Sequence, residues 1–225
     1  MMTRRQLALE ILPSTPPRLE DFVVGSNQEA VDILARWAAG REKERFIYLW
    51  GPHGVGKTHL LRALAPDAFI SCTPSTRFHA TPQPVQAVDD VHRLDRDGAL
   101  SLFHRFNEKR EDGSRLLVSG VHPPAKLDLP PELATRLGWG LVLRLHALED
   151  EQKILALQSR ALRLGARLPA DAARYLMTHC NRDTGYLFHF LHELNRWSLA
   201  AHRDTLSIPL IREVLEASSP PPLPH

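Results

Sequence analysis

Short apolar runs alternate with helix-like segments through the first two thirds of the chain. Runs of consecutive apolar residues predict buried strands, and apolar residues spaced three or four apart predict amphipathic helices between them. We expect strands at 46–50, 68–72, 85–88, 115–120 and 141–145, and helices at 28–39, 59–64, 98–110 and 131–137. This alternation predicts a parallel sheet covered by helices on both faces, which is a three-layer α/β/α domain. In the helix 98–110, Leu100, Phe103 and Phe106 lie at helical spacing and are expected to form its apolar face.

From Glu149 onward the apolar pattern keeps a helical period. Its stripes predict four helices, and they are most simply the core of a small helical bundle. Prolines interrupt both ends of the chain, so no helix is expected there. The predicted organisation is an extended arm at 1–18, the α/β domain at 19–146, the helical domain at 147–217 and a disordered tail at 218–225.

The stretch 51–58 has the pattern of a phosphate-binding loop. It reads Gly-Pro-His-Gly-Val-Gly-Lys-Thr and lies between a predicted strand and a predicted helix, which is the setting that the P-loop G-x-x-x-x-G-K-[ST] requires. Its glycines let backbone N–H groups turn inward and form, with the helix N-terminus, a nest for anionic oxygens. The residues expected at the nucleotide are Gly51, Pro52, His53, Gly54, Val55, Gly56, Lys57, Thr58 and His59.

An acidic pair follows the predicted strand 85–88. A strand that ends in Asp89 and Asp90 suits a Mg²⁺–nucleotide site beside a P-loop. We expect Asp89 and the Thr58 hydroxyl to hold Mg²⁺ and Asp90 to face the attacking water. The cofactors predicted for this site are ATP or ADP with Mg²⁺. The alternative for the acidic pair is a strand that simply meets a turn.

The N-terminal arm contains an alternating segment, in which Leu7, Leu9 and Ile11 follow Gln6. An exposed apolar terminus is costly unless something buries it. Two explanations are open: an edge strand folded back on its own domain, or a linear peptide inserted into the groove of a partner.

Composition excludes several classes of protein. The formal net charge of +2 and the sequence pI near 8.7 do not indicate electrostatic steering to nucleic acid. Cys72 and Cys180 form no disulfide framework, and the N-terminus has neither a signal-peptide core nor a run long enough to span a membrane, so we expect a cytoplasmic protein. His189 and His192 complete no known metal motif, so no metal held by protein side chains alone is expected.

Taken together, a P-loop α/β domain and a four-helix lid resemble an AAA+ ATPase module. The resemblance to the DnaA initiator family covers about residues 4–217. It is carried by residues 22–27, 56–61 and 88–91, and by 123–124 together with 133–140. The first of these resembles the segment that lies against adenine, which places Val24 at the base. The last resembles the segment with the arginine finger of the family, which makes Arg136 the residue that would act on the nucleotide of a neighbouring molecule.

The N-terminal arm makes the resemblance to DnaA-related proteins more specific. The peptide containing Gln6, Leu7, Leu9 and Ile11 looks like the Q-L-x-L peptide that docks on the β sliding clamp of DNA polymerase III, and the chain ends after the lid, where DnaA initiators continue into a DNA-binding domain. Both features are similar to the Hda family of DnaA-related regulators. The resemblance implies a regulator that binds the DNA-loaded clamp and promotes hydrolysis of DnaA-bound ATP, without sequence-specific DNA binding of its own. A homodimer is left open.

Three departures from the family pattern affect the chain's own ATP hydrolysis: two residue positions and a short segment between the P-loop and the acidic pair. Val121 stands where the family usually has an acidic residue, and Gly185 stands where it places a phosphate-sensing arginine, which leaves Arg182 as a substitute. These departures favour a nucleotide-binding switch over a turnover enzyme. The alternatives are a free-standing AAA+ ATPase and an initiation factor that loads DnaA.

Overall fold

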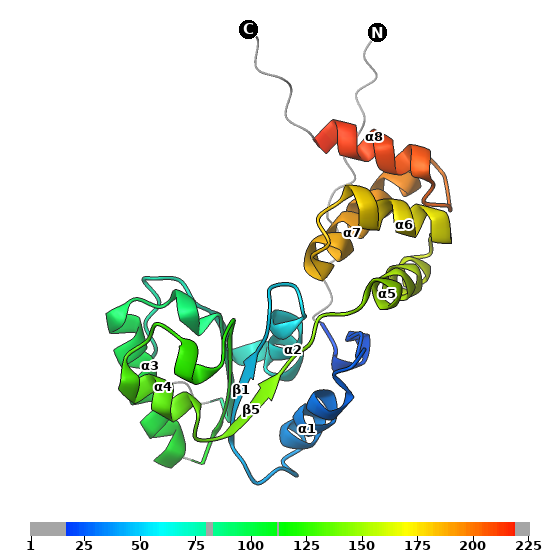
Figure 1. The fold of residues 1–225 in the computed structure, drawn as a ribbon. Helices are drawn as coiled ribbons and strands as arrows, with labels where there is room; N and C mark the ends of the chain where they lie inside the picture. Colours follow the sequence, from blue (N-terminus) through cyan, green and yellow to red (C-terminus); the bar gives the residue numbers. More distant parts are fainter. Residues whose placement is uncertain (1–16, 80–82, 112, 219–225) are drawn as a thin grey trace, which may run out of the picture. The chain divides into compact units, whose positions relative to one another are not determined.

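The computed structural model describes residues 17–79, 83–111 and 113–218 of the 225-residue chain (Figure 1). These residues fall into two compact units, 17–147 and 148–218. The alternating segment with Gln6, Leu7, Leu9 and Ile11 and the predicted disordered tail from residue 219 onward lie outside the described residues. Within the described part of the chain, no helix combines the length and the apolar character that a membrane crossing needs.

The first unit contains a five-stranded, fully parallel sheet. The strand order is β2-β3-β4-β1-β5, so β4 lies between β1 and β3. The strands are β1 (Phe46–Trp50), β2 (Phe69–Ser71), β3 (Val85–Asp89), β4 (Arg115–Gly120) and β5 (Leu141–Arg144). All five lie within one or two residues of the strands predicted from the apolar runs.

Helices cover both faces of this sheet, which confirms the predicted α/β class (Figure 1). α1 (Gln28–Ala38) and α2 (Lys57–Leu64) pack on one face, and α3 (Arg96–Glu111) and α4 (Pro131–Leu137) pack on the other. In β1, Tyr48 belongs to the core cluster under α3 and α4, whereas Ile47 and Leu49 belong to the cluster under α1 and α2. Burial on both faces explains why the strands are continuous apolar runs and do not alternate with polar residues.

One detail of α3 differs from its predicted apolar face. Leu100 is 53% exposed, whereas Leu102 and Phe106 are buried against the sheet and Phe103 is partly buried. The prediction that Leu100 belongs to the apolar face of this helix was therefore wrong. Ala99, Leu102 and Phe106 repeat at the spacing of one helix face, and Leu100 lies about 100° away from Ala99 around the helix.

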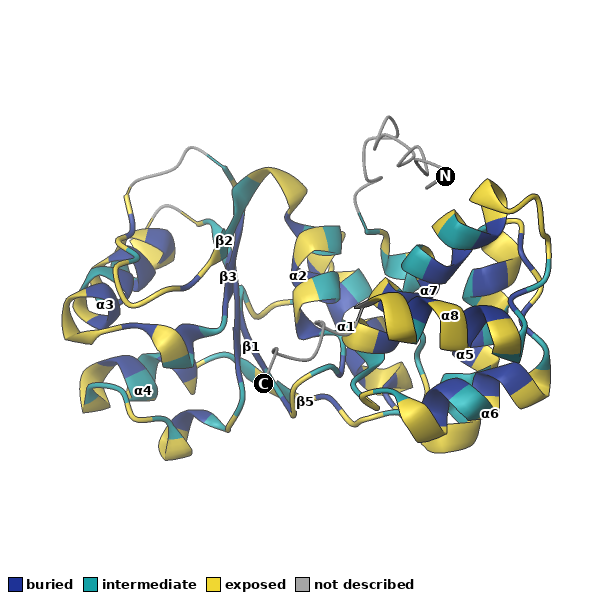
Figure 2. Cartoon of the chain, turned by 90° about the horizontal axis from the view of Figure 1, so that it is seen from above, coloured by how far each residue is buried: buried dark blue, intermediate teal, exposed yellow. Residues whose placement is uncertain are grey.

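The second unit is a bundle of four helices: α5 (Asp150–Arg163), α6 (Ala170–His179), α7 (Thr184–Ala200) and α8 (Ile208–Ser218). Their apolar stripes meet in one core cluster, and the buried positions follow the inner faces of the helices in Figure 2. A capping box of Glu149 and Gln152 starts α5, and the Asp183 carboxylate caps α7 by accepting the Tyr186 N–H at 2.8 Å. These caps satisfy backbone donors that the first helical turn leaves unpaired.

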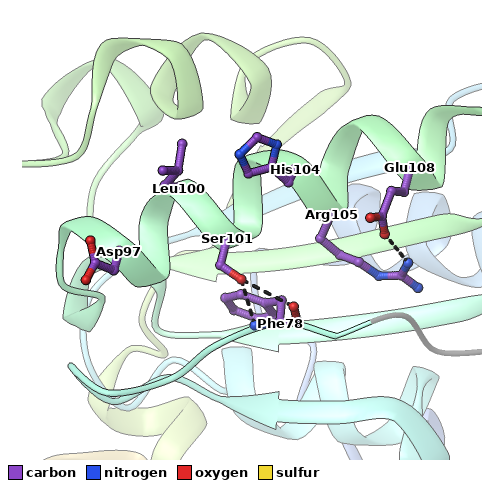
Figure 3. A pocket seen from close by; sticks show the side chains of 7 residues that line it. All are labelled: Phe78, Asp97, Leu100, Ser101, His104, Arg105 and Glu108. Atoms are coloured by element: carbon purple, nitrogen blue, oxygen red, sulfur yellow. Dashed lines mark hydrogen bonds and ion pairs between the residues drawn. The ribbon is translucent and has the colours of Figure 1, made fainter.

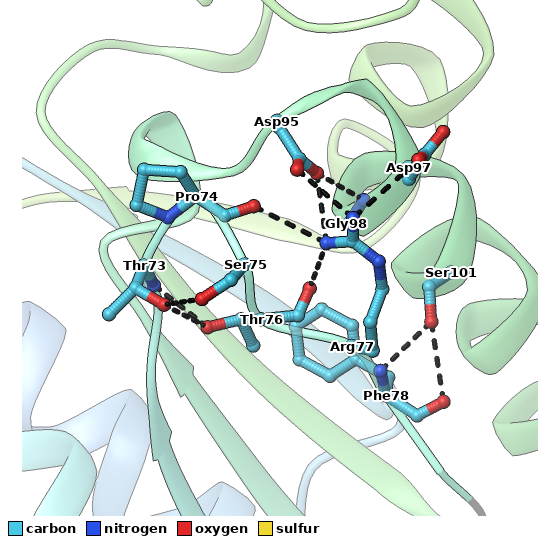
Figure 4. A network of polar contacts seen from close by, with 10 residues as sticks. All are labelled: Thr73, Pro74, Ser75, Thr76, Arg77, Phe78, Asp95, Asp97, Gly98 and Ser101. Atoms are coloured by element: carbon cyan, nitrogen blue, oxygen red, sulfur yellow. Dashed lines mark hydrogen bonds and ion pairs between the residues drawn. The ribbon is translucent and has the colours of Figure 1, made fainter.

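A polar network connects the segment that follows β2 with the start of α3 (Figure 4). The Arg77 guanidinium donates to both Asp95 oxygens at 2.9 and 3.0 Å, and Asp95 also accepts the Gly98 N–H at 2.7 Å at the start of α3. The hydrogen bond from Arg77 is the main reason why the pKa of Asp95 is lowered. The Ser101 hydroxyl of α3 also binds this segment, because it accepts the Phe78 N–H at 2.9 Å.

The turn from α4 into β5 supplies a test of the packing. A Cβ on Gly140 would overlap the Phe46 carbonyl oxygen of β1, whereas a Cβ on Gly138 would make an ordinary contact of 3.5 Å with the Thr135 carbonyl. We expect Gly140→Ala to lower the free energy of unfolding by at least about 2 kcal/mol, because β5 cannot approach β1 without a backbone shift. Gly138→Ala, the matched control, should change it by about 0.5 kcal/mol or less.

Chemical denaturation of both variants measures the difference. Equal losses for the two alanines would contradict the close approach of Gly140 to β1.

Candidate nucleotide site

The P-loop joins the carboxyl end of β1 to the start of α2. Gly54 and Gly56 have φ angles of 74° and 95°, in the left-handed region that favours glycine. A side chain on Gly56 would also meet the Phe22 ring at 2.6 Å. Gly56 is the N-cap of α2, so the loop delivers its backbone N–H groups and the positive end of the helix to one place. The local geometry is that of an anion-binding loop.

Lys57 is held inside this loop. It is 5% exposed, and its Nζ donates to the carbonyls of Gly51 and Pro52 at 2.8 Å each. These contacts place a buried ammonium charge at the loop that the sequence assigns to phosphate binding. The structure thus brings Lys57 to the position expected of a P-loop lysine.

The Asp89 carboxylate links three elements at the edge of the sheet. Asp89 is 1% exposed, and its Oδ2 accepts the Thr58 hydroxyl of α2 at 2.6 Å. Its Oδ1 accepts the Ser119 hydroxyl at the end of β4. Both residues predicted to hold Mg²⁺ are therefore in direct contact.

Ser119 is a site residue that the sequence analysis did not identify. Val88 of β3 pairs with Val118 of β4, so the next residues, Asp89 and Ser119, end side by side. A polar residue at the end of an apolar run was the only signal in the sequence. Its meaning depends on the strand order, because β4 must be the neighbour of β3.

Asp90 turns away from the sheet in a left-handed conformation, with φ 57° and ψ 48°. Aspartate tolerates this region better than most residues, and the Asp90 N–H donates to the Ser119 hydroxyl at 3.0 Å. His92 lies nearby, with its Nδ1 3.9 Å from the Asp90 Oδ1, and its ring is 6.2 Å from the ring of His53 in the P-loop. Burial lowers the pKa of His92, and the Asp90 carboxylate opposes this shift. His92 is thus a second residue of the site found only in the structure.

The entry segment before α1 is attached to the same unit. Val24 is half-buried, and its carbonyl accepts the Asn27 N–H at 2.9 Å. Asn27 is buried and bonds the backbone of His146 twice, at 3.0 and 2.7 Å. The His59 Nε2 lies 2.9 Å from the Arg18 carbonyl oxygen. These contacts fix the segment of Val24 against α2 and against the chain after β5.

The donor set fits a Mg²⁺-bound nucleotide. Hydroxyl and carboxylate oxygens are the ligands that Mg²⁺ prefers, and Thr58 and Asp89 offer them beside the Lys57 ammonium. Lys57 and the loop amides would hold the phosphates, and Thr58 and Asp89 would hold the metal. A bound metal would supply charge neutralisation at the phosphates.

Two other predicted residues lie apart from these contacts. The Arg136 guanidinium, at the end of α4, lies 3.5 Å from the centroid of the Trp139 ring. Arg182 belongs to the second unit, where its Nε donates to the Met177 carbonyl at 3.1 Å and its Nη1 donates to Asp150 at 3.3 Å. For both residues, the roles at a nucleotide stay predictions.

A cavity of about 380 Å³ lies along α3 and does not include the P-loop (Figure 3). Its polar side chains are paired locally, since Ser101 bonds Phe78 and Arg105 bonds Glu108 at 2.7 Å. The lining residues are Phe78, Asp97, Leu100, Ser101, His104, Arg105 and Glu108. Its arginine already donates to Gln86 and Glu108, and the cavity lies away from the glycine-rich loop, so the P-loop is the candidate site.

The chain is similar to one protein family and to several solved structures. The family model described as "Hda, lid domain" matches residues 150–215. Domain III of the Thermotoga maritima replication initiation protein DnaA has a TM-score of 0.74 at 20% identity, with 92% of this chain and 98% of that chain covered. AMPPCP-bound DnaA from Aquifex aeolicus gives 0.67 at 18% identity, with 92% and 71% covered.

A third similar structure is the RuvB Holliday junction branch migration motor of Thermotoga maritima. Its TM-score is 0.64 at 16% identity, with 90% of this chain and 72% of that chain covered. The chain therefore has the α/β fold of the AAA+ domains of DnaA and RuvB, and its second unit matches the Hda lid.

Removing the Ser119 hydroxyl tests the contacts around Asp89. We expect Ser119→Ala to weaken Mg²⁺-dependent ADP binding about tenfold, because the carboxylate loses one of the two hydroxyls that orient it. Calorimetric titration with ADP, with and without Mg²⁺, measures the change. Ser101→Ala is the matched control, since it removes a serine hydroxyl bonded to Phe78 outside the site.

In the same titration, Lys57→Ala gives the loss of ADP affinity that follows from removing the ammonium group of the loop. Unaltered ADP binding in Lys57→Ala would contradict the nucleotide site, and an equal loss in Ser119→Ala and Ser101→Ala would contradict the role of Ser119.

Proposed function

We propose that this chain is a nucleotide-binding regulator of DnaA-dependent replication initiation. It binds the β sliding clamp of DNA polymerase III on DNA and promotes hydrolysis of DnaA-bound ATP, which inactivates the initiator. The observation that carries the proposal is the match of residues 150–215 to the Hda lid domain, on a chain that covers 98% of DnaA domain III at a TM-score of 0.74.

The P-loop supports binding of ADP or ATP with Mg²⁺. Lys57 donates to the carbonyl of Gly51 in the loop, and Thr58, the next residue of α2, donates to Asp89 at the end of β3. The similar DnaA from Aquifex aeolicus is described as bound to AMPPCP. In this proposal the nucleotide acts as a switch: ADP and ATP stabilise the active surface of the chain to different extents.

The chain's own hydrolysis is proposed to be weak. Val121 follows β4 and has no group that could orient a water molecule, and Gly185 near the start of α7 has no side chain to sense a phosphate. A Cβ at position 185 would lie 3.1 Å from the Asp183 Oδ1, which caps α7, so a longer side chain would disturb this cap. Arg182 is engaged by Met177 and Asp150 and can act as the substitute only by leaving them.

A free-standing ATPase is the second candidate, and Asp90 favours it. Its backbone is fixed by Ser119, and its carboxylate lies beside His92 at the P-loop. Steady ATP turnover by the isolated chain, lost in Lys57→Ala, would support this candidate over the regulator.

In this proposal, Arg136 is the arginine finger that promotes hydrolysis of the ATP bound to DnaA. A guanidinium delivered to the phosphates of a neighbour's ATP stabilises charge in the transition state, and in GTPases such a finger is worth about 10³–10⁵ in rate. Arg136 is only partly buried at the end of α4, and its guanidinium lies over two aromatic rings. Among the described residues, no carboxylate forms an ion pair with it. A cation held in this way suits an anionic partner.

We expect Arg136→Ala to reduce the stimulated hydrolysis of DnaA-bound ATP at least about 100-fold, toward the rate of DnaA alone. The measurement follows the ATP bound to DnaA over time in a mixture of DnaA, clamp, DNA and this chain. Arg144→Ala is the matched control, because Arg144 also lies over a tryptophan ring, 5.0 Å from the centroid of Trp50. Full stimulation by Arg136→Ala would remove the finger from the proposal.

The clamp role rests on the alternating segment of the arm. Replacing Leu7 and Leu9 with alanine should weaken clamp binding more than about tenfold, because both side chains would lose apolar contacts in the groove of the clamp. Replacing Arg4 and Arg5 with alanine, the matched control, removes only charge. Surface plasmon resonance on immobilised clamp distinguishes the two, and loss of binding in the arginine variant alone would refute the peptide assignment.

A further inference from the structure

An arginine–aromatic cluster lies where α3 passes the C-terminal end of α4. The Arg136 guanidinium lies over two rings: its Cζ is 3.5 Å from the centroid of Trp139 and 5.4 Å from the centroid of Phe103. Arg110 lies over the same Trp139 ring at 5.3 Å. Phe103 and Arg110 come from α3, whereas Trp139 follows α4, so the cluster joins two helices on one face of the sheet.

Trp139 and Arg110 of the cluster are exposed to solvent, whereas the Nε atom of Arg136 is buried. Trp139 is 44% exposed, which is unusual for so large an apolar side chain, and Arg110 is exposed. Arg136 is partly buried, and its Nε is buried without a hydrogen-bond partner in the described part of the chain. Contacts with aromatic rings therefore hold the guanidinium in place. Among the described residues, no carboxylate accepts a hydrogen bond from its N–H groups.

We propose that Trp139 and Phe103 position Arg136 for a phosphate group of a nucleotide bound to the neighbouring protein, and that Arg110 adds a second cation at the same place. The inference rests on the proposed function, in which Arg136 acts on DnaA-bound ATP. Trp139 is the main positioning residue, since its ring is the closest to the guanidinium.

The physical reason lies in how a stacked arginine binds an anion. A guanidinium over an aromatic face is attracted by the electron density of the ring and uses none of its N–H donors for this contact. A carboxylate in the place of the ring would neutralise the charge and occupy the donors that a phosphate needs. An unstacked arginine would also lose more side-chain freedom on binding, so the rings prepare Arg136 in advance.

The test uses the complete mixture of DnaA, clamp, DNA and this chain. Trp139→Leu should lower the maximal rate of DnaA-bound ATP hydrolysis about fivefold or more, while the concentration for half-maximal stimulation changes less than about twofold. Trp139→Phe should restore most of the rate, because it keeps an aromatic face. ADP binding and the thermal midpoint of unfolding should match the wild type, since Trp139 is 44% exposed and its ring contacts Arg110 and Arg136.

A double variant separates this inference from the proposed function. If Trp139 acts through Arg136, Trp139→Leu should cause no further loss in an Arg136→Ala background. An additive loss, or a Trp139→Leu variant that stimulates as well as or better than the wild type, would overturn the positioning role while the finger role survives. Normal stimulation by Arg136→Ala itself would instead remove the finger role on which this inference rests.

Discussion

The nucleotide site depends on one buried carboxylate. Asp89 lies among apolar residues at the end of β3, where an ionised side chain without partners would be costly. Hydroxyls from Thr58 and Ser119 offset this cost and connect α2, β3 and β4 through the two oxygens of a single side chain. Because Thr58 is the residue that follows the P-loop lysine, the same hydrogen bond that satisfies Asp89 also orients the start of α2.

Two cations of the first unit are held in contrasting ways. Lys57 donates to backbone carbonyls of its own loop, whereas Arg136 is held by contacts with aromatic rings, which use none of its N–H donors. The first arrangement suits a phosphate bound by this chain, and the second suits a phosphate presented by another molecule. The proposed division of labour between the chain and DnaA follows from this contrast.

Secondary structure was largely predictable because the sheet is buried on both faces. Continuous apolar runs such as 46–50 have few alternatives to a buried parallel strand when helix-like segments flank them. The error at Leu100 has a related origin. Spacing shows that a helix has an apolar face, but only the packing partners show which of several apolar residues lies at its centre. The clamp-binding segment stays a prediction, because it lies outside the described residues.

By itself, the sequence determined the P-loop, the acidic strand end and the helical lid, because each depends on local spacing and on residue types that few other structures use. The tertiary structure decided which distant residues complete these motifs. Ser119 reaches Asp89 only because β4 lies next to β3, and Phe103 reaches Arg136 only because α3 and α4 pack on the same face of the sheet. Such contacts follow from strand order and chain direction in space, which no local pattern of residues encodes.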